Sequence, residues 1–296
     1  IWIHPRLVKI AHLKNTVDNP NARKLQQTPV PVLGGVAVFF GIVLGIALAS
    51  TYVSCTSLMT IVAAMMIMLY TGTMDDLLDL SALLRFAVEI GVVMLLIYAN
   101  DISINNFNGL WGVGVIPDTL AIPLTIFASV GIINAINMID GVNGLSSGYC
   151  IMASIAFGSL FYASDNVSML ILAAVSVGSL IPFLFHNVFG KTSKMFIGDG
   201  GTLVMGVVMS TFVINILTNG SSVSSSVDSN FGLVPFTLAV MAIPVFDTLR
   251  VMLTRIVRGT SPFHPDKTHL HHLFIDLGFS HAGTTVTIIT LNILVI

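Results

Sequence analysis

Residues 31–50 read PVLGGVAVFFGIVLGIALAS, a run of 20 residues that contains no Asp, Glu, Lys or Arg. An α-helix needs about 20 apolar residues to cross the hydrocarbon core of a bilayer. The run also contains several Gly and Ala residues, which are typical of helices that pack closely together in lipid. This stretch therefore predicts a membrane-spanning helix.

The same criterion finds further candidate spans along the chain. Together with the first, they lie at 31–50, 57–73, 83–99, 119–138, 145–163, 168–186, 201–217, 232–250 and 284–296. We expect the segment before Lys14 to be the remnant of one more span, and residues 291–296 to be cut within a helix. The predicted fold class is all-α: a polytopic transmembrane helical bundle of about 9–10 spans that forms a single domain over residues 1–296.

The composition supports lipid as the solvent. Hydrophobic residues make up 55% of the chain and charged residues only 9%, whereas soluble domains carry about 25% charged residues. The mean hydropathy is +0.94. The two cysteines, Cys55 and Cys150, lie far apart in apolar surroundings and indicate neither a disulfide framework nor a metal site. We expect no soluble domain and no nucleic-acid partner.

The Lys and Arg residues indicate the orientation of the chain. If the loops alternate, one set lies near 13–30, 74–82, 139–144, 187–200 and 251–283, and the other near 51–56, 100–118, 164–167 and 218–231. The second set contains none of the 12 Lys and Arg residues. Because Lys and Arg concentrate on the cytoplasmic side of membranes, the first set is predicted to face the cytoplasm.

Carboxylates follow directly after the span at 57–73, where residues 75–79 read DDLLD. Helix positions three and four apart share a side, so Asp75, Asp76 and Asp79 can face one direction. Clustered carboxylates raise one another's pKa unless a cation joins them, and Mg²⁺ typically takes one or two carboxylates plus substrate phosphates. A helix end with its acids spread in water explains this motif, taken alone, about equally well.

Amides and a carboxylate recur at a spacing of three in Asn134, Asn137 and Asp140, followed by a Gly-rich turn that ends at Gly144. Polar groups inside a membrane helix are costly unless they are satisfied. Interhelical hydrogen bonds are thus the competing explanation, above all for Asn134, but they account less well for Asp140. Glu89 also lies within a span, and there a hydrogen bond to a neighbouring helix is a simpler explanation than a functional role.

A glycine-rich segment precedes the span at 201–217, where residues 196–202 read FIGDGGT. Glycines let the main chain approach a ligand closely, and the amides at a helix start favour phosphate. Asp199 would supply a metal ligand beside that phosphate. A tight turn that needs glycine explains this motif, taken alone, slightly better.

Histidines gather near the end of the chain, where residues 264–272 read HPDKTHLHH after Arg255 and Arg258. His and Arg side chains can hold a pyrophosphate. Zinc is the second interpretation, but neither a cysteine nor an HExxH pattern accompanies these histidines. A solvated loop with incidental histidines is the third.

Taken together, four distant segments place carboxylates, amides, basic residues and histidines at one membrane face. The joint interpretation is a Mg²⁺-dependent site for a phosphorylated substrate.

The motifs and their order resemble the polyprenyl-phosphate N-acetylhexosamine-1-phosphate transferases of bacterial membranes, in the WecA/TagO branch of the group that also contains MraY. The resemblance covers nearly the whole chain and rests on five motifs. They are Asp18-Asn19-Pro20 with Arg23-Lys24, Pro29, Pro31 and Gly34-Gly35; Asp75-Asp76 with Asp79; Asn134, Asn137 and Asp140-Gly141; Gly198-Asp199; and residues 261–267 with His269-Leu270-His271-His272.

The resemblance implies a reaction. N-acetylhexosamine-1-phosphate, with GlcNAc-1-phosphate as the first choice, would pass from a UDP-N-acetylhexosamine to undecaprenyl phosphate and release UMP. This would be the first membrane step of cell-envelope polysaccharide synthesis, in the bacterial cytoplasmic (inner) membrane. The implied cofactor is Mg²⁺, with Mn²⁺ as the alternative, and a homodimer is a candidate assembly.

The resemblance also implies roles for residues. Asp75 and Asp76 would be catalytic, and Asp199 and Asp76 would hold the metal. Asn143 departs from the family, which usually has an Asp there; Asn can still hydrogen-bond but brings no charge, and this bears on the choice of sugar nucleotide. The expected substrate-binding residues are Lys24, Asn137, Asp140, Asn143, Arg255, His269, His271 and His272.

Two other classes of protein are alternatives. A secondary transporter, or a flippase for lipid-linked sugars, places ionisable groups near the bilayer midplane, often in broken helices. The candidate residues here lie mostly at the cytoplasmic ends of the predicted spans, which disfavours transport. A CDP-alcohol phosphotransferase would carry a DxxDG…DxxxD pattern, which the chain lacks.

Overall fold

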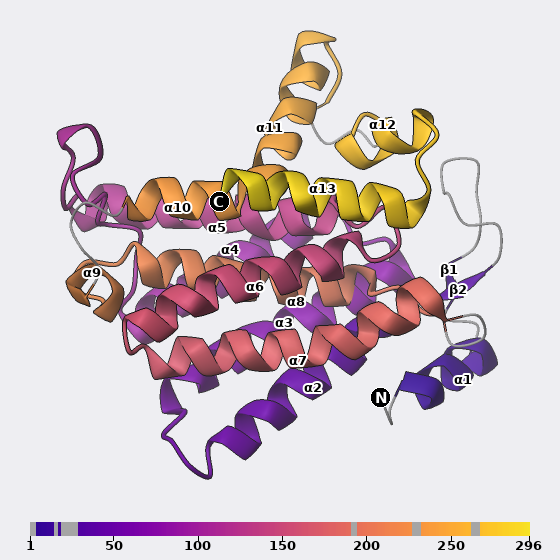
Figure 1. Cartoon of the computed structure of the whole chain (residues 1–296), viewed down its shortest axis with the longest axis horizontal. Coiled ribbons are helices and arrows are strands. Elements are labelled where there is room, and N and C mark those ends of the chain that lie inside the picture. The colour runs from indigo at the N-terminus through magenta and orange to yellow at the C-terminus, as the bar shows by residue number, and fades with distance from the viewer. Residues whose placement is uncertain (1–3, 15–16, 19–28, 191–193, 227–231, 262–266) are drawn as a thin grey trace.

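The chain folds into a bundle of helices, as predicted (Figure 1). The computed structural model describes residues 4–14, 17–18, 29–190, 194–226, 232–261 and 267–296. The elements are α1 (His4–Lys14), β1 (Val17–Asp18), β2 (Val30–Pro31), α2 (Gly34–Ala49), α3 (Thr56–Leu78), α4 (Ala82–Asn100), the 3₁₀ helix η1 (Leu110–Gly112), α5 (Asp118–Met138), α6 (Leu145–Ala163), α7 (Val167–Phe189), α8 (Gly198–Ile216), α9 (Ser222–Ser226), α10 (Leu233–Val240), α11 (Ala242–Val257), α12 (Leu270–Asp276) and α13 (His281–Val295).

The predicted spans correspond to helices, but in the described part of the chain six of them, or seven if one bent pair counts as a span, are long and apolar enough to cross a membrane, fewer than the predicted 9–10. By length and composition, the six helices α3 to α8 can each cross a membrane, which makes this a multi-pass membrane protein. Helices α2 and α13 are apolar but shorter, at 16 and 15 residues. The span predicted over 232–250 corresponds to two helices, because α10 and α11 form a pair bent by 72° that can count as one span.

Helix α8 is the centre of the bundle. Almost every one of its residues is buried, and α2, α3, α5, α6 and α10 pack around it. Figure 1 shows α6 and α7 lying across the front of α8. Close packing depends on small residues here: a Cβ atom on Gly206 would lie 2.7 Å from the Cα atom of Ile133 in α5. Such contacts are how helices associate in lipid, where the hydrophobic effect does not drive them together.

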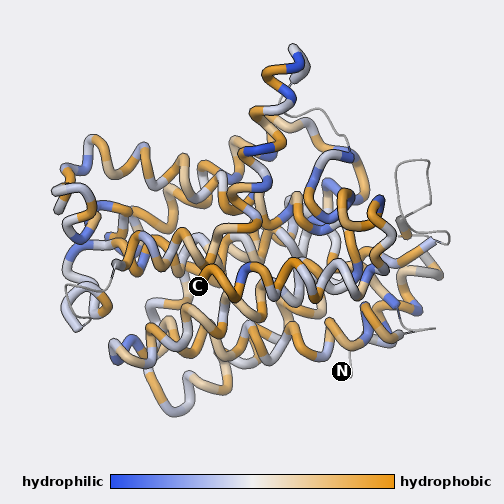
Figure 2. The backbone as a smooth tube through the Cα atoms, turned by 45° about the horizontal axis from the view of Figure 1, so that its top comes forward, coloured by the Kyte–Doolittle hydropathy of each residue, from blue (hydrophilic) through white to orange (hydrophobic). Residues whose placement is uncertain are grey.

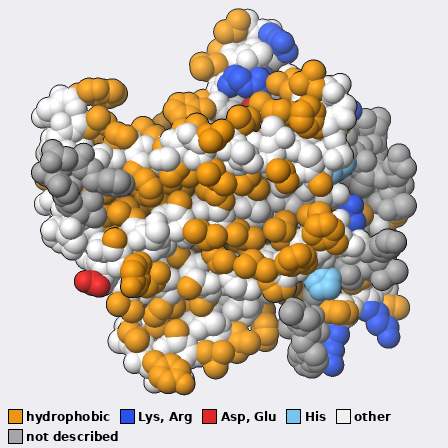
Figure 3. All heavy atoms as spheres, viewed as in Figure 1, with side chains coloured by type: hydrophobic (Ala, Val, Ile, Leu, Met, Phe, Trp, Pro, Cys, Tyr) orange, Lys and Arg blue, Asp and Glu red, His pale blue; other side chains and the backbone are white. Residues whose placement is uncertain are grey.

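The sides of the bundle are hydrophobic and the ends are polar. Large apolar side chains point outward along the helices, and Phe127 in the middle of α5 is 76% exposed. Figure 3 shows hydrophobic side chains spread over the face drawn, while the Lys and Arg side chains lie at one end and on the projecting helix α11. Figure 2 shows the same separation along the chain. Lipid around the sides accounts for this pattern.

The described parts of the loops predicted to face the cytoplasm lie toward one end of the bundle. That end holds α1, the short β1–β2 pair, the start of α8 and the helix α12 (Figure 1). The two strands are antiparallel, with Val17 opposite Pro31, and the sequence did not predict them. The opposite end holds α9 and the loop between α4 and α5.

Candidate active site

At the polar end of the bundle, the main chains of α2 and α3 contact the main chain at the start of α8. The N–H groups of Gly34 and Gly35 at the start of α2 donate to the carbonyls of Phe196 (3.0 Å) and Ile197 (2.7 Å), just before α8. A Cβ atom on Gly72 of α3 would lie 2.5 Å from the carbonyl carbon of Asp199. Side chains at these glycines would force the helices apart, so glycine here brings the end of α3 against the start of α8.

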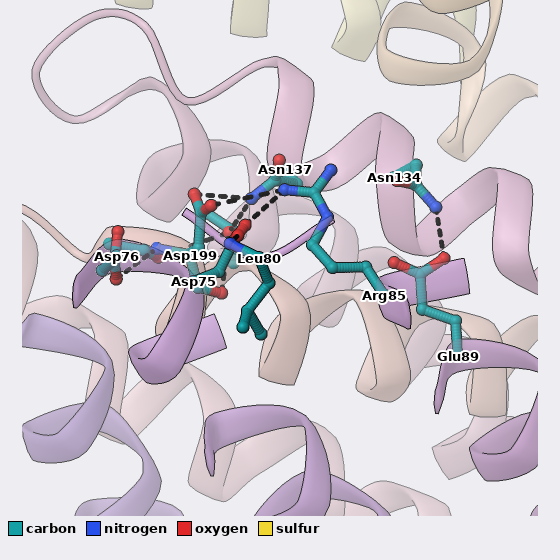
Figure 4. Close-up of polar contacts among 10 residues, drawn as sticks. Asp75, Asp76, Leu80, Arg85, Glu89, Asn134, Asn137 and Asp199 are labelled. Atoms are coloured by element: carbon teal, nitrogen blue, oxygen red, sulfur yellow. Dashed lines mark hydrogen bonds and ion pairs between the residues drawn. The ribbon is translucent and has the colours of Figure 1, made fainter. Parts of the chain in front are cut away.

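This contact assembles a group of residues that we call the aspartate cluster: Asp75, Asp76, Asp199, Asn137 and Arg85 (Figure 4). The Asp199 N–H donates to Asp76 Oδ2 at 3.0 Å. Asn137 Nδ2 donates to Asp199 Oδ1 at 2.9 Å. Arg85 donates to Asp75, and its Nη1 atom lies 3.7 Å from Asp199 Oδ2. Residues that are more than 100 positions apart in sequence thus share one site.

The three carboxylates differ in exposure. Asp75 is buried, and its Oδ1 atom also accepts the Leu80 N–H at 2.8 Å. Asp76 is exposed, and the side chain of Asp199 is 35% exposed. The exposed Asp76 and the half-buried Asp199 are therefore accessible to a ligand, whereas the buried Asp75 is paired with Arg85.

The predicted position of Asp79 is wrong. Helix α3 ends at Leu78, and Asp79 follows in a left-handed conformation with φ of 51°, so it does not share a helical face with Asp75 and Asp76.

The donor set of the cluster fits a magnesium ion that is completed by substrate. In the described part of the chain, no three or more His, Cys, Asp or Glu side chains form a group that could hold a metal ion by themselves. Mg²⁺ usually takes only one or two carboxylates and fills its remaining positions with water and substrate phosphates. Asp76 and Asp199 are adjacent, accessible and of like charge, and a cation between them would relieve their repulsion.

Glu89 and Asn134 form a separate polar pair within the bundle. Glu89 is 1% exposed, and its Oε2 atom accepts a hydrogen bond of 2.5 Å from Asn134 Nδ2. The interhelical hydrogen bond predicted for both residues is confirmed. Glu89 also lies one helical turn after Arg85 on α4, and the two charges interact.

The loop after α5 places Asp140 beside the cluster. Ser146 Oγ donates to Asp140 Oδ1 at 2.5 Å. Burial raises the pKa of Asp140 to about 6; the charge of Asp199 acts in the same direction, and the hydrogen bond from Ser146 opposes it. Asn143 is held by its main chain, since its carbonyl accepts from Thr285 Oγ1 at 2.9 Å.

A second group, which we call the histidine cluster, comprises His269, His271, His272, Asp247 and Arg250. His269 Nδ1 lies 2.9 Å from Asp247 Oδ2, and the rings of His269 and His271 stack with centroids 5.7 Å apart. The ring centroids of His271 and His272 are 4.4 Å apart. Arg250 Nη2 donates to Asp247 Oδ1 at 2.7 Å, so one carboxylate ties α11 to the histidines.

His271 joins the two clusters. A Cβ atom on Gly141 would lie 2.1 Å from His271 Nε2, so the imidazole packs on the loop that carries Asp140. The His271 Nδ1 atom is buried without a hydrogen-bond partner in the structure. Burial lowers the pKa of His271 to about 3, and the neighbouring His272 and His269 add to this shift.

Two further expected site residues are Arg255 and Lys24. Arg255 is buried in the last turn of α11. Lys24 lies outside the described residues, as do the motif residues 19–23 and 262–266.

Arg85, Asp247 and Arg250 belong to the two clusters but were not predicted as site residues. Asp247 carried a usable signal, because an ionisable residue inside a predicted span indicates a functional position. Arg85 was interpreted only as one of the Lys and Arg residues that indicate the orientation of the chain in the membrane.

Known proteins are similar to this chain in sequence. A family model described as glycosyl transferase family 4 matches residues 58–217. A Bacillus subtilis protein named probable undecaprenyl-phosphate N-acetylglucosaminyl 1-phosphate transferase is 30% identical over 97% of this chain and 77% of its own length. Two proteins named undecaprenyl-phosphate alpha-N-acetylglucosaminyl 1-phosphate transferase, from Salmonella typhi and Escherichia coli K12, are 32% and 29% identical, each over 95% of this chain and 74% of their own length.

The matched region contains every residue of the aspartate cluster, and the matches to the relatives extend over nearly the whole chain. The chain therefore belongs to glycosyl transferase family 4.

Proposed function

We propose that this protein transfers GlcNAc-1-phosphate from UDP-GlcNAc to undecaprenyl phosphate and releases UMP. The observation that carries the proposal is the convergence of Asp76 and Asp199, from the end of α3 and the start of α8, at one polar end of a membrane bundle. The names of the relatives supply the substrates. A lipid phosphate and a soluble nucleotide can meet only at such an interface.

In this proposal the aspartate cluster binds the metal ion and stabilises the negative charge of the reacting phosphates. Asp76 and Asp199 would hold Mg²⁺, or Mn²⁺ as the alternative, and the ion when bound would neutralise the diphosphate of the sugar nucleotide. Arg85, fixed by Asp75, faces the same space and would stabilise negative charge on the transferred phosphoryl group. Asp75 thereby orients the catalytic groups from a buried position.

The reaction needs positioning more than a strong base. An oxygen of undecaprenyl phosphate attacks the phosphorus next to the sugar, a new P–O bond forms, and the bond to UMP breaks. The second pKa of a phosphate monoester is about 6, so the nucleophile is already largely ionised near neutral pH. Phosphoryl transfer of this kind depends on alignment and charge neutralisation.

The remaining residues are proposed to bind substrate. His269, His271 and His272 would contact the diphosphate or the sugar, with Arg255 beside them. Asn137, Asp140 and Asn143 would seat the nucleotide, and Lys24 would meet the lipid phosphate. The Lys and Arg distribution supports a cytoplasmic-facing site in the bacterial inner membrane.

Purified protein in detergent tests the function directly. With Mg²⁺, UDP-GlcNAc and undecaprenyl phosphate, it should release UMP in proportion to lipid consumed. EDTA should stop the release, and added Mg²⁺ or Mn²⁺ should restore it. The proposal fails if no UDP-sugar yields UMP, or if the Asp76→Asn protein keeps full activity. A panel of UDP-N-acetylhexosamines in the same assay identifies the sugar.

A further inference from the structure

The bend between α10 and α11 leaves main-chain groups without helical partners. In a continuous helix each N–H bonds to the carbonyl four residues earlier. Pro244 has no N–H, so the Val240 carbonyl loses its partner. Ile243 N–H and the Ala239 carbonyl would bond to one another in an unbroken helix.

The side chain of Asn292 lies between these groups. The Ile243 N–H donates to Asn292 Oδ1 at 3.1 Å. Asn292 Nδ2 lies 3.3 Å from the Ala239 carbonyl and 3.2 Å from the Val240 carbonyl, and donates toward both. The Asn292 amide therefore bridges the Ile243 N–H and the Ala239 carbonyl, which would bond to one another directly in a continuous helix. Tyr149 also donates to the Val240 carbonyl, from α6.

Asn292 is built into this position. It is 0% exposed and lies on the buried face of α13 with Thr284 and Ile288. An amide inside an apolar bundle is costly unless its polar atoms are paired. The three hydrogen bonds to the bend satisfy its oxygen and its nitrogen, which accounts for an amide at this depth.

The direction of α11 decides where the histidine cluster lies. Asp247 is four residues beyond Ile243, and it accepts from His269 and from the Leu270 N–H. Arg255 lies two turns further along the same helix. A change in the bend would move both residues relative to His271, whose ring rests on the loop that carries Asp140.

We propose that Asn292 is a positioning residue that holds the bend and so sets Asp247 against the histidines. Without the amide, the Ile243 N–H and the Ala239 carbonyl lose their partner, and they can bond to one another if α10 and α11 straighten toward one helix. The consequence for catalysis rests on the proposed function, whereas the consequence for helix direction does not.

Distance measurements test the helix direction. Spin labels at Val257→Cys, on an 87% exposed site near the tip of α11, and at Phe189→Cys, 72% exposed at the end of α7, report the position of α11. About 22 Å of helix separates the bend from Val257, so a change of about 20° would move the label by about 8 Å. Both native cysteines are buried and are left out of the labelling.

The test variant is Asn292→Leu, which keeps a similar volume and removes every hydrogen bond. Tyr149→Phe is the matched control, because it removes one donor to the same carbonyl and leaves Asn292 in place. We expect the label distance to shift by at least 5 Å or its distribution to broaden in Asn292→Leu only. An unchanged distribution in Asn292→Leu overturns the proposal.

Kinetics test the positioning role. The KM for the UDP-sugar should rise at least fivefold in Asn292→Leu, and the KM for undecaprenyl phosphate should stay within twofold. A shifted distance with an unchanged KM for the UDP-sugar would overturn the link to the histidine cluster. If Asn292→Leu does not give folded protein, Asn292→Ser is measured with the same two outcomes. A parent protein without transferase activity would refute the proposed function and leave the distance test intact.

Discussion

The aspartate cluster and the histidine cluster lie at the same end of the bundle, but the chain builds them by different means. The aspartates lie on α3 and α8, two long helices whose main chains touch at Gly72 and Asp199. The histidines lie on or next to the short helix α12, and Asp247 of α11 connects them to the bundle. The first cluster depends on main-chain packing and the second on side-chain bonds.

The two clusters should therefore respond differently to substitution. A side-chain substitution in the aspartate cluster leaves the main-chain contacts between α3 and α8 in place, so it should remove activity and preserve the fold. In the histidine cluster, the Asp247 carboxylate would help to position the substrate-binding histidines, and it also connects α11 to α12. Substitutions there should weaken the fold and the binding of substrate together.

The largest effect is expected from Asp199→Asn. The substitution removes a negative charge that the proposed metal needs, and we expect kcat to fall by about a thousandfold, in line with the loss of a major electrostatic contact in an active site. The melting temperature should stay close to that of the parent protein. Steady-state UMP release and a thermal melt in detergent measure the two quantities.

Asp165→Asn is the matched control for this prediction. Asp165 is exposed in the turn between α6 and α7, away from the cluster, and its φ of 52° suits Asn. Its activity should equal that of the parent. A stable Asp199→Asn protein with kcat within threefold of the parent would remove Asp199 from the mechanism.

The second effect is expected from Asp247→Asn, and it should show the opposite balance. Asp247 is 7% exposed and accepts from His269, Arg250 and the Leu270 N–H. Loss of its charge should lower the free energy of unfolding by about 2 kcal/mol, because hydrogen bonds to a charged group contribute about 1.5–3 kcal/mol. We expect the KM for the UDP-sugar to rise about tenfold.

Asp276→Asn serves as the control, because Asp276 is exposed at the end of the same helix α12. Chemical unfolding and substrate titration provide the measurements. The distinction between the clusters breaks down if Asp247→Asn lowers kcat as strongly as Asp199→Asn and leaves stability unchanged.

The sequence predicted the outlines of both clusters for a physical reason. Hydropathy locates spans because lipid demands long apolar helices. The alternation of Lys and Arg then places distant loops on one side, which brings the motifs with Asp76, Asp199 and His271 to one face. Helix ends are where polar groups can gather, so the motifs were visible between the spans.

The bend of α10 and α11 could not be predicted in the same way. Pro123 lies inside α5 and Pro182 inside α7, and neither helix is broken. Proline alone therefore does not decide where a membrane helix breaks. At Pro244 the freed carbonyl finds partners in Tyr149 and Asn292, from two other helices, and such partners become known only from the fold.

The histidine cluster should also make stability depend on pH. The pKa of His271 is lowered to about 3 by burial and by its neighbours, whereas an unfolded His titrates near 6.5. Between these values the unfolded form of His271 binds more protons than the folded form, so the contribution of His271 to stability falls as the pH falls below about 6.5. The loss should reach up to about 2 kcal/mol at pH 5, from about 1.4 kcal/mol per pH unit.

His271→Asn should abolish most of this pH dependence between pH 6.5 and pH 5. His186→Gln, in the last turn of α7, is the control and should keep it. Asp199→Asn should keep it as well, which separates the two clusters by a second measurement. The interpretation of His271 as a buried neutral side chain is wrong if the His271→Asn protein loses stability as steeply as the parent.

The smallest effect is expected beside the aspartate cluster, at Glu89. Glu89→Gln retains an oxygen that can accept from Asn134, so only the charge one turn from Arg85 is lost. We expect kcat within threefold of the parent and an unchanged melting temperature. Glu89→Leu leaves the Asn134 amide without this acceptor and should cost about 0.6–1.7 kcal/mol, from the average to the maximum found for hydrogen bonds between membrane helices.

These two variants decide whether the aspartate cluster ends at Arg85. If Glu89→Gln lowers kcat more than tenfold while the melting temperature stays unchanged, the carboxylate acts on the reaction through Arg85, and the cluster extends one turn further along α4. If only Glu89→Leu has an effect, and that effect is on stability, the pair of Glu89 and Asn134 joins α4 to α5. The second result is expected, because Glu89 Oε2 accepts directly from Asn134 at 2.5 Å, whereas Arg85 donates to Asp75.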